Sequence, residues 1–143
     1  MLQIVSTKQN TVIKEIAKEY LKFAFMKDGV EQTGETLDEF YFLVNENKII
    51  GCCKINFNEE ITGDNIYPLI TSLHIKEDYR KRNYAQLLIN HVIQKAELLG
   101  HTTAYLKINN LETYEIKNWT QLDLNSVQNN EGTIFYKRID ERR

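Results

Sequence analysis

The chain of 143 residues is poor in the residues that mark several special classes of protein. One proline, six glycines and two cysteines exclude collagen-like, low-complexity and disulfide-stapled folds. No apolar run approaches the ~20 residues of a membrane-spanning helix, and the first residues lack the pattern of a signal peptide. Positive charge is not in excess, because 18 basic and 20 acidic side chains leave a net charge of −2. These absences disfavour nucleic acid and membranes as partners and predict a cytoplasmic protein.

What the chain contains is typical of one globular unit. Apolar residues make up 42% and charged residues 27%, enough to fill one core and to solvate its surface, so we expect a single domain over residues 1–143. Cys52 and Cys53 are adjacent in a strand-like run, which predicts that their side chains point to opposite faces of a sheet. Without a nearby pair of histidines they are expected to pack as small apolar side chains and to bind no metal.

Hydrophobic periodicity predicts the order β-α-β-β-β-α-β-α-β-β, an α/β (α+β) fold. Strands are expected at residues 2–7, 40–44, 48–57, 66–75, 102–108, 124–128 and 133–139, and helices at residues 12–27, 84–99 and 111–119. The helix at 84–99 lies between two strands and predicts a parallel crossover. We therefore expect a mixed, mostly antiparallel sheet of six to seven strands, flanked by about three helices.

The most informative segment leads from a strand through a basic loop into a helix. Arg80, Lys81 and Arg82 supply positive charge directly before the helix, whose N-terminus offers unpaired N–H groups and a partial positive charge. Asn83 tolerates a positive φ, and Ala85 is small enough to let a pyrophosphate approach the backbone. This pattern is typical of a phosphate-binding loop. A solvated basic turn at the start of a surface helix is the alternative interpretation.

Residues 72–88 resemble the acetyl-CoA-binding signature of the GNAT family of N-acetyltransferases. In that signature a strand ends in Val or Ile, and Arg/Gln-x-x-Gly-x-Gly/Ala then opens a helix. Ile75 matches the end of the strand, Arg80 the first position of the motif, Asn83 its first glycine and Ala85 its last residue. The sequence departs from the family at Asn83, and at Glu77, where proline is common.

A second match lies downstream, in residues 113–119. This stretch resembles the Phe-Tyr-x-x-x-Gly-Phe segment of the family, with Tyr114 on the tyrosine, Asn118 on the glycine and Trp119 on the last phenylalanine. In relatives an asparagine at a strand end precedes that tyrosine by about seven residues. Here Asn109 and Asn110 precede Tyr114 by five and four residues, so the connection is shortened.

The resemblance implies that two neighbouring strands are splayed apart and that the pantetheine of acetyl-CoA enters between them. Acetyl-CoA is then a co-substrate, and no metal is implied. The residues that the resemblance assigns to its binding are Leu73, His74, Ile75, Arg80, Lys81, Arg82, Asn83, Tyr84, Ala85 and Asn110. A backbone N–H near Leu73 or His74 would stabilise the oxyanion of the tetrahedral intermediate.

Catalytic roles follow from the same resemblance. Tyr114 is the candidate acid that protonates the departing thiolate, with a core tyrosine as the alternative. The strand before the loop lacks the glutamate that many relatives use as a base. His74, expected to share a strand face with Ser72, is a candidate base, and a chain of water molecules is the alternative to it.

The acceptor is expected to be a primary amine of a small molecule or a peptide. Acidic side chains crowd two loops near the expected entrance, and they favour a cationic amine, although they are also typical of solvated loops. These residues are Glu31, Glu35, Asp38, Glu39, Glu59, Glu60 and Asp64. The sequence leaves open whether the protein forms a homodimer. The alternative functions are a non-catalytic acyl-CoA sensor of the same fold and, against the acidic net charge, a nucleic-acid-binding module that uses residues 79–82.

Overall fold

The computed structural model describes residues 2–8, 11–28, 40–57, 66–108, 118–122 and 133–139. These residues form a sheet of seven strands, two α-helices and two 3₁₀ turns. The strands are β1 (Leu2–Val5), β2 (Phe40–Asn45), β3 (Lys48–Asn56), β4 (Leu69–Ile75), β5 (Thr103–Ile108), β6 (Thr120–Gln121) and β7 (Thr133–Arg138). The helices are α1 (Lys14–Asp28) and α3 (Tyr84–Leu98), which follow the 3₁₀ turns η1 (Thr11–Ile13) and η3 (Glu77–Tyr79).

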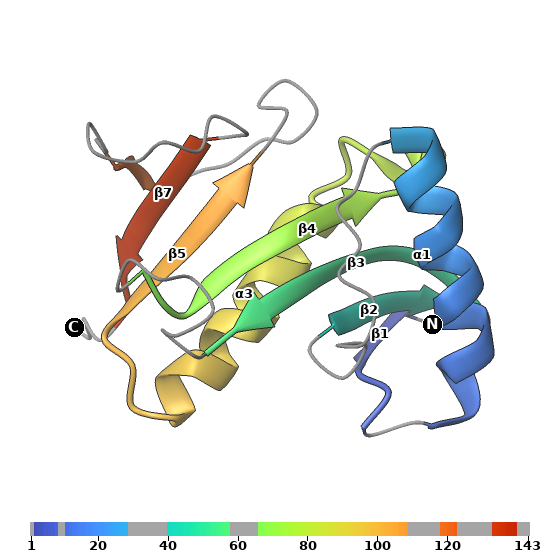
Figure 1. Ribbon diagram of the computed structural model, residues 1–143, viewed down its shortest axis with the longest axis horizontal. Coiled ribbons are helices and arrows are strands. Elements are labelled where there is room, and N and C mark those ends of the chain that lie inside the picture. The colour runs from blue at the N-terminus through green and yellow to red at the C-terminus, as the bar shows by residue number, and fades with distance from the viewer. Residues whose placement is uncertain are drawn as a thin grey trace.

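The strands follow the order β1-β2-β3-β4-β5-β7-β6 across the sheet (Figure 1). Neighbouring strands are antiparallel except β4 and β5, which are parallel and are connected through α3. A parallel pair requires a crossover of this kind, because its two strands run in the same direction. The predicted mixed, mostly antiparallel sheet and its helical crossover are confirmed.

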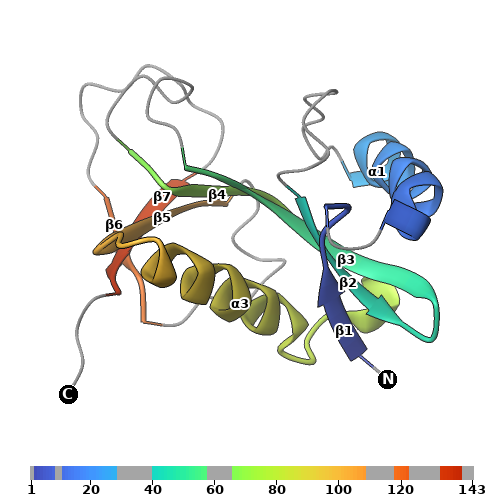
Figure 2. The ribbon, with the colours of Figure 1, turned by 90° about the horizontal axis from the view of Figure 1, so that it is seen from below.

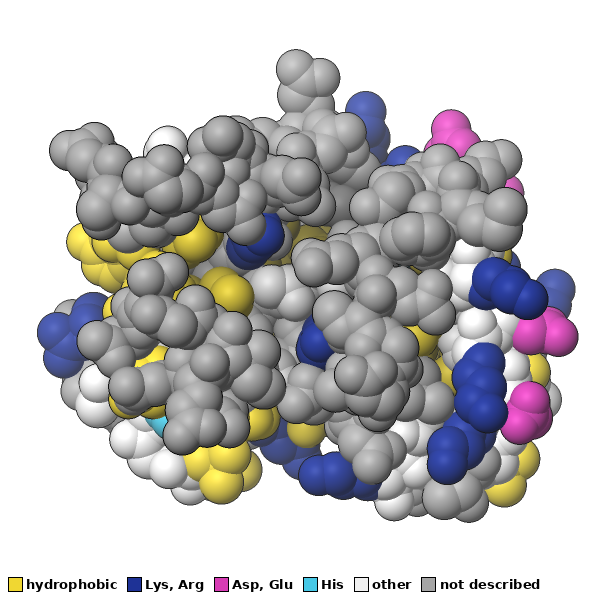
Figure 3. Space-filling view, viewed as in Figure 1, with side chains coloured by type: hydrophobic (Ala, Val, Ile, Leu, Met, Phe, Trp, Pro, Cys, Tyr) yellow, Lys and Arg dark blue, Asp and Glu magenta, His cyan; other side chains and the backbone are white. Residues whose placement is uncertain are grey.

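The two helices cover opposite faces of the sheet (Figure 2). Against α1 pack the aromatic residues of β2, including Phe40 and Phe42, together with Ile49 and Cys52 of β3. Against α3 packs a larger cluster that draws on β3, β4 and β5. The solvent side of α1 carries Lys side chains interspersed with acidic ones (Figure 3). Both helices are therefore amphipathic, and each buries one stripe against the sheet.

The adjacent cysteines behave as expected. Cys52 belongs to the cluster under α1 and Cys53 to the cluster under α3, so the two side chains point to opposite faces. Both are free and buried. Burial raises the pKa of Cys53 to about 12 and that of Cys52 well above its usual value. Both thiols are consequently neutral at physiological pH, as packing residues should be.

Most predicted elements are present with shifted ends. The hairpin between β2 and β3 turns through Glu46 and Asn47, with φ of 54° and 67°, a conformation that asparagine tolerates and that tight hairpins require. The strand predicted at 66–75 begins only at Leu69. None of the helices in the described ranges has the length and apolar composition needed to cross a membrane.

The last third of the chain differs most from the prediction. Asn118 and Trp119, expected to close a helix, are not helical, and the rest of that predicted helix lies outside the described residues. Strand β6 pairs with β7 and begins four residues before the strand that was predicted at 124–128. The predicted strand itself lies outside the described residues. Asn118 adopts a φ of 70°, which turns the chain into β6.

Candidate functional site

Strands β4 and β5 touch at one end only. They pair through Leu69 with Tyr105 and Ile70 with Leu106, supported by a bond from the Tyr105 N–H to the Pro68 carbonyl at 2.9 Å. Beyond Ile70 no pairing joins the two strands, and they diverge toward their C-terminal ends (Figure 1). The predicted splayed pair is therefore present, and one edge of β4 from residue 71 to 75 faces the opening.

A β-bulge lies where the two strands part. On β3, Cys52 faces His74 and Lys54 faces Thr71, so Cys53 alone opposes the two residues Ser72 and Leu73. Ser72 lies at the bulge and adopts a φ of 54°. An extra residue bends the strand and re-aims its neighbours, and a positive φ at a non-glycine residue costs about 1 kcal/mol or more.

The bulge also interrupts the alternation of side chains along β4. Ile70 and Leu73 are three residues apart and both belong to the cluster under α3. We expected Ser72 and His74 to share a face because side chains alternate along a regular strand. The bulge at Ser72 interrupts this alternation, so a shared face no longer follows from it.

The backbone of β4 presents Leu73 and Ile75 to the opening. The Lys76 N–H bonds the Ile50 carbonyl of β3 at 2.8 Å, and His74 lies opposite Cys52. Since successive residues of a strand direct their backbone groups to opposite edges, Leu73 and Ile75 face away from β3. The bond that the Ile75 carbonyl accepts from Arg80 Nε, in the loop after β4, agrees with this direction.

The loop after β4 is held by its first arginine. Arg80 Nε donates to the Ile75 carbonyl at 2.7 Å, which ties the loop to the end of the strand. The Arg82 guanidinium lies over the Tyr79 ring, 5.7 Å from its centroid. Lys81, Arg82 and Asn83 are exposed. The sequence predicted that Arg80, Lys81 and Arg82 all supply positive charge for binding an anion. In the structure the side chains of Lys81 and Arg82 are exposed, whereas Arg80 also bonds the end of β4.

The loop enters α3 through left-handed backbone. Lys81 has a φ of 64°, and Asn83, the residue before the helix, has φ 65° and ψ 17°. The first amide that bonds back into the helix is that of Leu87, to the Asn83 carbonyl at 3.1 Å. The N–H groups of Tyr84, Ala85 and Gln86 have no intrahelical acceptor. The first turn of α3 carries no acidic side chain, so its N-terminus remains suited to an anion.

His74 lies on the opposite side of the sheet from α3. Its ring is 1% exposed and contacts the rings of Tyr20 and Phe23 of α1, with centroids 5.4 and 6.4 Å away. Its Nδ1 is hydrogen-bonded to the Tyr20 hydroxyl, which also donates to the His74 carbonyl at 3.4 Å. His74 therefore links β4 to α1, and its role as a base stays a prediction.

Several predicted site residues lie outside the described ranges, namely Asn110, Tyr114 and the acidic residues of the two loops. The structure brings together the predicted residues from Leu73 to Ala85. Sequence reasoning missed the bulge at Ser72 and the contact of Tyr20 with His74. Neither leaves a local signal, because the bulge depends on the register against β3 and the contact joins residues 54 positions apart. Among the described residues no cluster of potential metal ligands is present.

A splayed strand pair followed by a loop into a helix N-terminus is what the resemblance to acetyl-CoA-dependent transferases implies. The sequence profile of the Acetyltransferase (GNAT) family matches residues 10–122, more than half of the chain. The chain belongs to this family, whose members are acyl-CoA-dependent N-acetyltransferases. A search of curated proteins found no match to the sequence.

Solved structures share the fold at low sequence identity. An aminoglycoside 6'-acetyltransferase type Ii superposes with a TM-score of 0.70 at 16% identity, over 100% of this chain and 99% of that one. A GNAT acetyltransferase of Staphylococcus aureus Mu50 gives 0.70 at 13%, over 97% and 99%. The N-acetylglutamate synthase of Neisseria gonorrhoeae, solved with coenzyme A and N-acetyl-glutamate, gives 0.69 at 14%, over 97% of this chain but 35% of that one.

Proposed function

We propose that the protein transfers the acetyl group of acetyl-CoA directly to a primary amine. The observation that supports this most strongly is the clustering of unusual backbone along one segment. Ser72, Lys81 and Asn83 all have positive φ although none is glycine. Such conformations are unfavourable and persist at functional sites. Here they open a strand edge at one end of the segment and expose helix amides at the other.

The two ends of the segment fit two parts of acetyl-CoA. Amides between Arg80 and Ala85 bind the pyrophosphate, helped by the helix N-terminus and by the Arg82 guanidinium. The backbone groups of Leu73 and Ile75 bind the pantetheine as a neighbouring strand would. Between Leu73 and His74, the direction of the backbone supports Leu73 as the donor to the thioester carbonyl, because its N–H is expected to face the opening.

Direct transfer requires an acid and a route for the amine's proton, but no covalent enzyme intermediate. The family resemblance places Tyr114 as the acid, since a phenol keeps its proton at neutral pH. His74 is 1% exposed and its Nδ1 is hydrogen-bonded to the Tyr20 hydroxyl, so it has little direct access to solvent. A chain of water molecules is the simpler route for the proton of the acceptor.

The acceptor that the sequence favours is a cationic amine of a small molecule or a peptide. The acidic residues of the loops at 31–39 and 59–64 support this choice. Similar folds are found with different small molecules: the synthase of Neisseria gonorrhoeae is solved with N-acetyl-glutamate, and another similar structure is an aminoglycoside acetyltransferase.

The test is amine-dependent release of coenzyme A from acetyl-CoA across a panel of polyamines, aminoglycosides, amino acids and lysine peptides. We expect at least one cationic amine to accelerate thiol release well above the rate without amine. The competing function is a non-catalytic acyl-CoA sensor. It would bind acetyl-CoA, seen as a raised melting temperature, while no amine of the panel accelerated release.

A further inference from the structure

Two side chains on the α1 side of the sheet bond the backbone of β4, one on each side of Leu73. The thiol of Cys52 in β3 donates to the Ser72 carbonyl at 3.6 Å, a distance that suits the large sulfur atom. The hydroxyl of Tyr20 in α1 donates to the His74 carbonyl at 3.4 Å. Both bonds are made at the bulge of β4, where the strand is irregular and its peptide groups need support.

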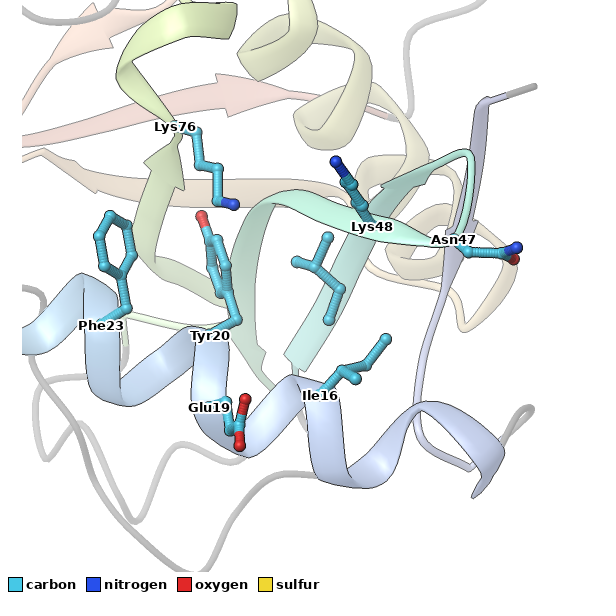
Figure 4. A pocket seen from close by; sticks show the side chains of 8 residues that line it. Ile16, Glu19, Tyr20, Phe23, Asn47, Lys48 and Lys76 are labelled. Carbon is cyan, nitrogen blue, oxygen red and sulfur yellow. The ribbon is translucent and has the colours of Figure 1, made fainter.

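Tyr20 projects from α1 toward the end of β4, beside Phe23 and Lys76 (Figure 4). These three side chains line a cavity of about 280 Å³, and Tyr20 itself is 5% exposed. Its hydroxyl is hydrogen-bonded both to His74 Nδ1 and to the His74 carbonyl. Because a hydroxyl has one proton, both bonds form together when Nδ1 carries a proton and donates to the hydroxyl oxygen. The pair of bonds therefore assigns the Nδ1–H tautomer to His74.

Cys52 keeps the proton that its bond to the Ser72 carbonyl requires. Its side chain is buried in the cluster under α1, and this burial raises the pKa of the thiol well above its usual value. A neutral thiol can donate a hydrogen bond, whereas a thiolate can only accept one. The neighbouring Cys53 lies in the cluster under α3, and within the described ranges its thiol makes no hydrogen bond to β4.

The two bonds fix the direction of two peptide groups. Neither the peptide after Ser72 nor the one after His74 is cis. In a trans peptide the carbonyl and the N–H of the next residue point in opposite directions. Since the Ser72 carbonyl points toward Cys52, the Leu73 N–H points away from it, and the His74 carbonyl directs the Ile75 N–H in the same manner. Both N–H groups are thereby aimed at the edge of β4 that faces β5.

We propose that Cys52 and Tyr20 are positioning residues for the acetyl-CoA site. Cys52 orients the Leu73 N–H, which bonds the thioester carbonyl, and Tyr20 orients the Ile75 N–H, which bonds the pantetheine. Each side chain acts through a peptide group of β4, and a donor that is already oriented does not have to be ordered when the ligand binds. The inference rests on the proposed function for the location of acetyl-CoA.

The experiment measures the binding of acetyl-CoA and of CoA to the full chain by calorimetry. CoA contains the pantetheine but lacks the acetyl carbonyl, so the ratio of the two affinities reports on the bond from the Leu73 N–H. Cys52→Ala should weaken binding of acetyl-CoA about threefold to tenfold and leave binding of CoA nearly unchanged. Tyr20→Phe removes only the hydroxyl and should weaken both ligands about threefold to tenfold, because both contain the pantetheine.

Two matched variants control for the loss of packing. Cys53→Ala removes the same side chain from the other face of β3 and should not change the ratio of the two affinities. Phe23→Leu removes a ring whose centroid lies 6.4 Å from that of His74, without removing a bond to the strand, and should change neither affinity. Melting curves verify that each variant folds. Cys52→Val fills the space of the thiol without a donor and gives the same test if Cys52→Ala does not fold.

A measurement on the free protein tests the bond from Tyr20 without any ligand. The ¹⁵N shifts of the His74 imidazole distinguish its two tautomers, and we expect the proton on Nδ1. A proton on Nε2 alone would overturn the role of Tyr20, because its hydroxyl would then donate to Nδ1 and not to the His74 carbonyl.

The role of Cys52 is overturned if the ratio of the affinities for acetyl-CoA and CoA is the same in Cys52→Ala as in the wild type. The role of Tyr20 is overturned if Tyr20→Phe binds both ligands as tightly as the wild type does. A wild-type protein that binds neither ligand overturns this proposal and the proposed function together. If the variants behave as expected while no amine accelerates release of CoA, the positioning roles hold and acetyl transfer fails.

Discussion

Asn83 stands where the GNAT signature has a glycine, and its backbone explains why asparagine is accepted there. Its φ of 65° and ψ of 17° lie in the left-handed region, which asparagine adopts more readily than other residues with a side chain. Its side chain makes no capping bond to the helix. Asn83→Gly is therefore expected to preserve the loop, and acetyl-CoA binding should be unchanged or tighter.

A charge reversal at Arg82 tests the role of the loop in acetyl-CoA binding more directly than a change at Asn83. Its guanidinium is exposed and lies over Tyr79, so a change to glutamate should leave the core intact. Arg82→Glu should weaken acetyl-CoA binding by about 1–3 kcal/mol, measured by calorimetry. Lys22→Glu on the solvent side of α1 makes the same charge reversal away from the loop and should have little effect. Equal affinities of the two variants would remove Arg82 from the site.

Tyr114 is the residue on which an enzymatic function depends most. Tyr114→Phe keeps the ring and removes the hydroxyl proton, so kcat should fall roughly 10²–10³-fold with little change in acetyl-CoA affinity. The measurement is steady-state kinetics with an amine that the panel identifies, accompanied by a melting curve. A wild-type kcat in the variant would exclude Tyr114 as the acid.

The two thiols provide a test of packing at the same scale. Burial raises the pKa of Cys53 to about 12 and that of Cys52 well above its usual value, so the reactive thiolate is scarce at pH 7–8. A thiol reagent should label neither cysteine in the folded protein and both in denaturant. Fast labelling of the native protein would show that one face of β3 is open to solvent.

At the scale of elements, the site depends on how closely β3 holds β4. Gly51 of β3 faces Ile75, and a Cβ at this position would lie 2.5 Å from Ile75 Cδ1 and 3.0 Å from the His74 carbonyl. Glycine is needed here for close approach of the two strands, not for a positive φ. The strand edge that faces β5 is thus positioned by a contact on its other edge.

Gly51→Ala should consequently push β4 away from β3 and lower the free energy of unfolding by about 1–3 kcal/mol, as overpacking does. Denaturant unfolding measures the change. The matched control is Gly100→Ala, where a Cβ would meet nothing within 4 Å and only the φ of +94° is unfavourable. If the variant at Gly51 were as stable as the wild type, β4 would not be fixed by this contact.

The sequence predicted elements with strong periodicity and missed those defined by long-range register. The α3 helix and the β2–β3 hairpin were predicted nearly to the residue because their apolar spacing and turn residues are local. The bulge at Ser72 and the position of β6 were not predicted, since both depend on how a strand pairs with a distant neighbour. In the site, the basic loop was predictable from its residues, whereas the direction of the Leu73 backbone required the structure.

At the scale of the whole molecule, β4 lies between two regions with different chemistry. Its edge toward β5 presents backbone groups and leads to the exposed amides of α3. Its other side is tied to α1 through Tyr20 and adjoins the cavity lined by Tyr20, Phe23 and Lys76. The family membership of the chain accounts for the first region.

Binding of acetyl-CoA between β4 and β5 is tested most directly by backbone amide shifts of the ¹⁵N-labelled protein during titration with acetyl-CoA. We expect the largest shifts at Leu73, at Ile75 and in the loop from Arg80 to Ala85, with small ones at Lys48 and Ile49 across β4. Saturable binding whose largest shifts fell elsewhere, or no binding at all, would contradict it.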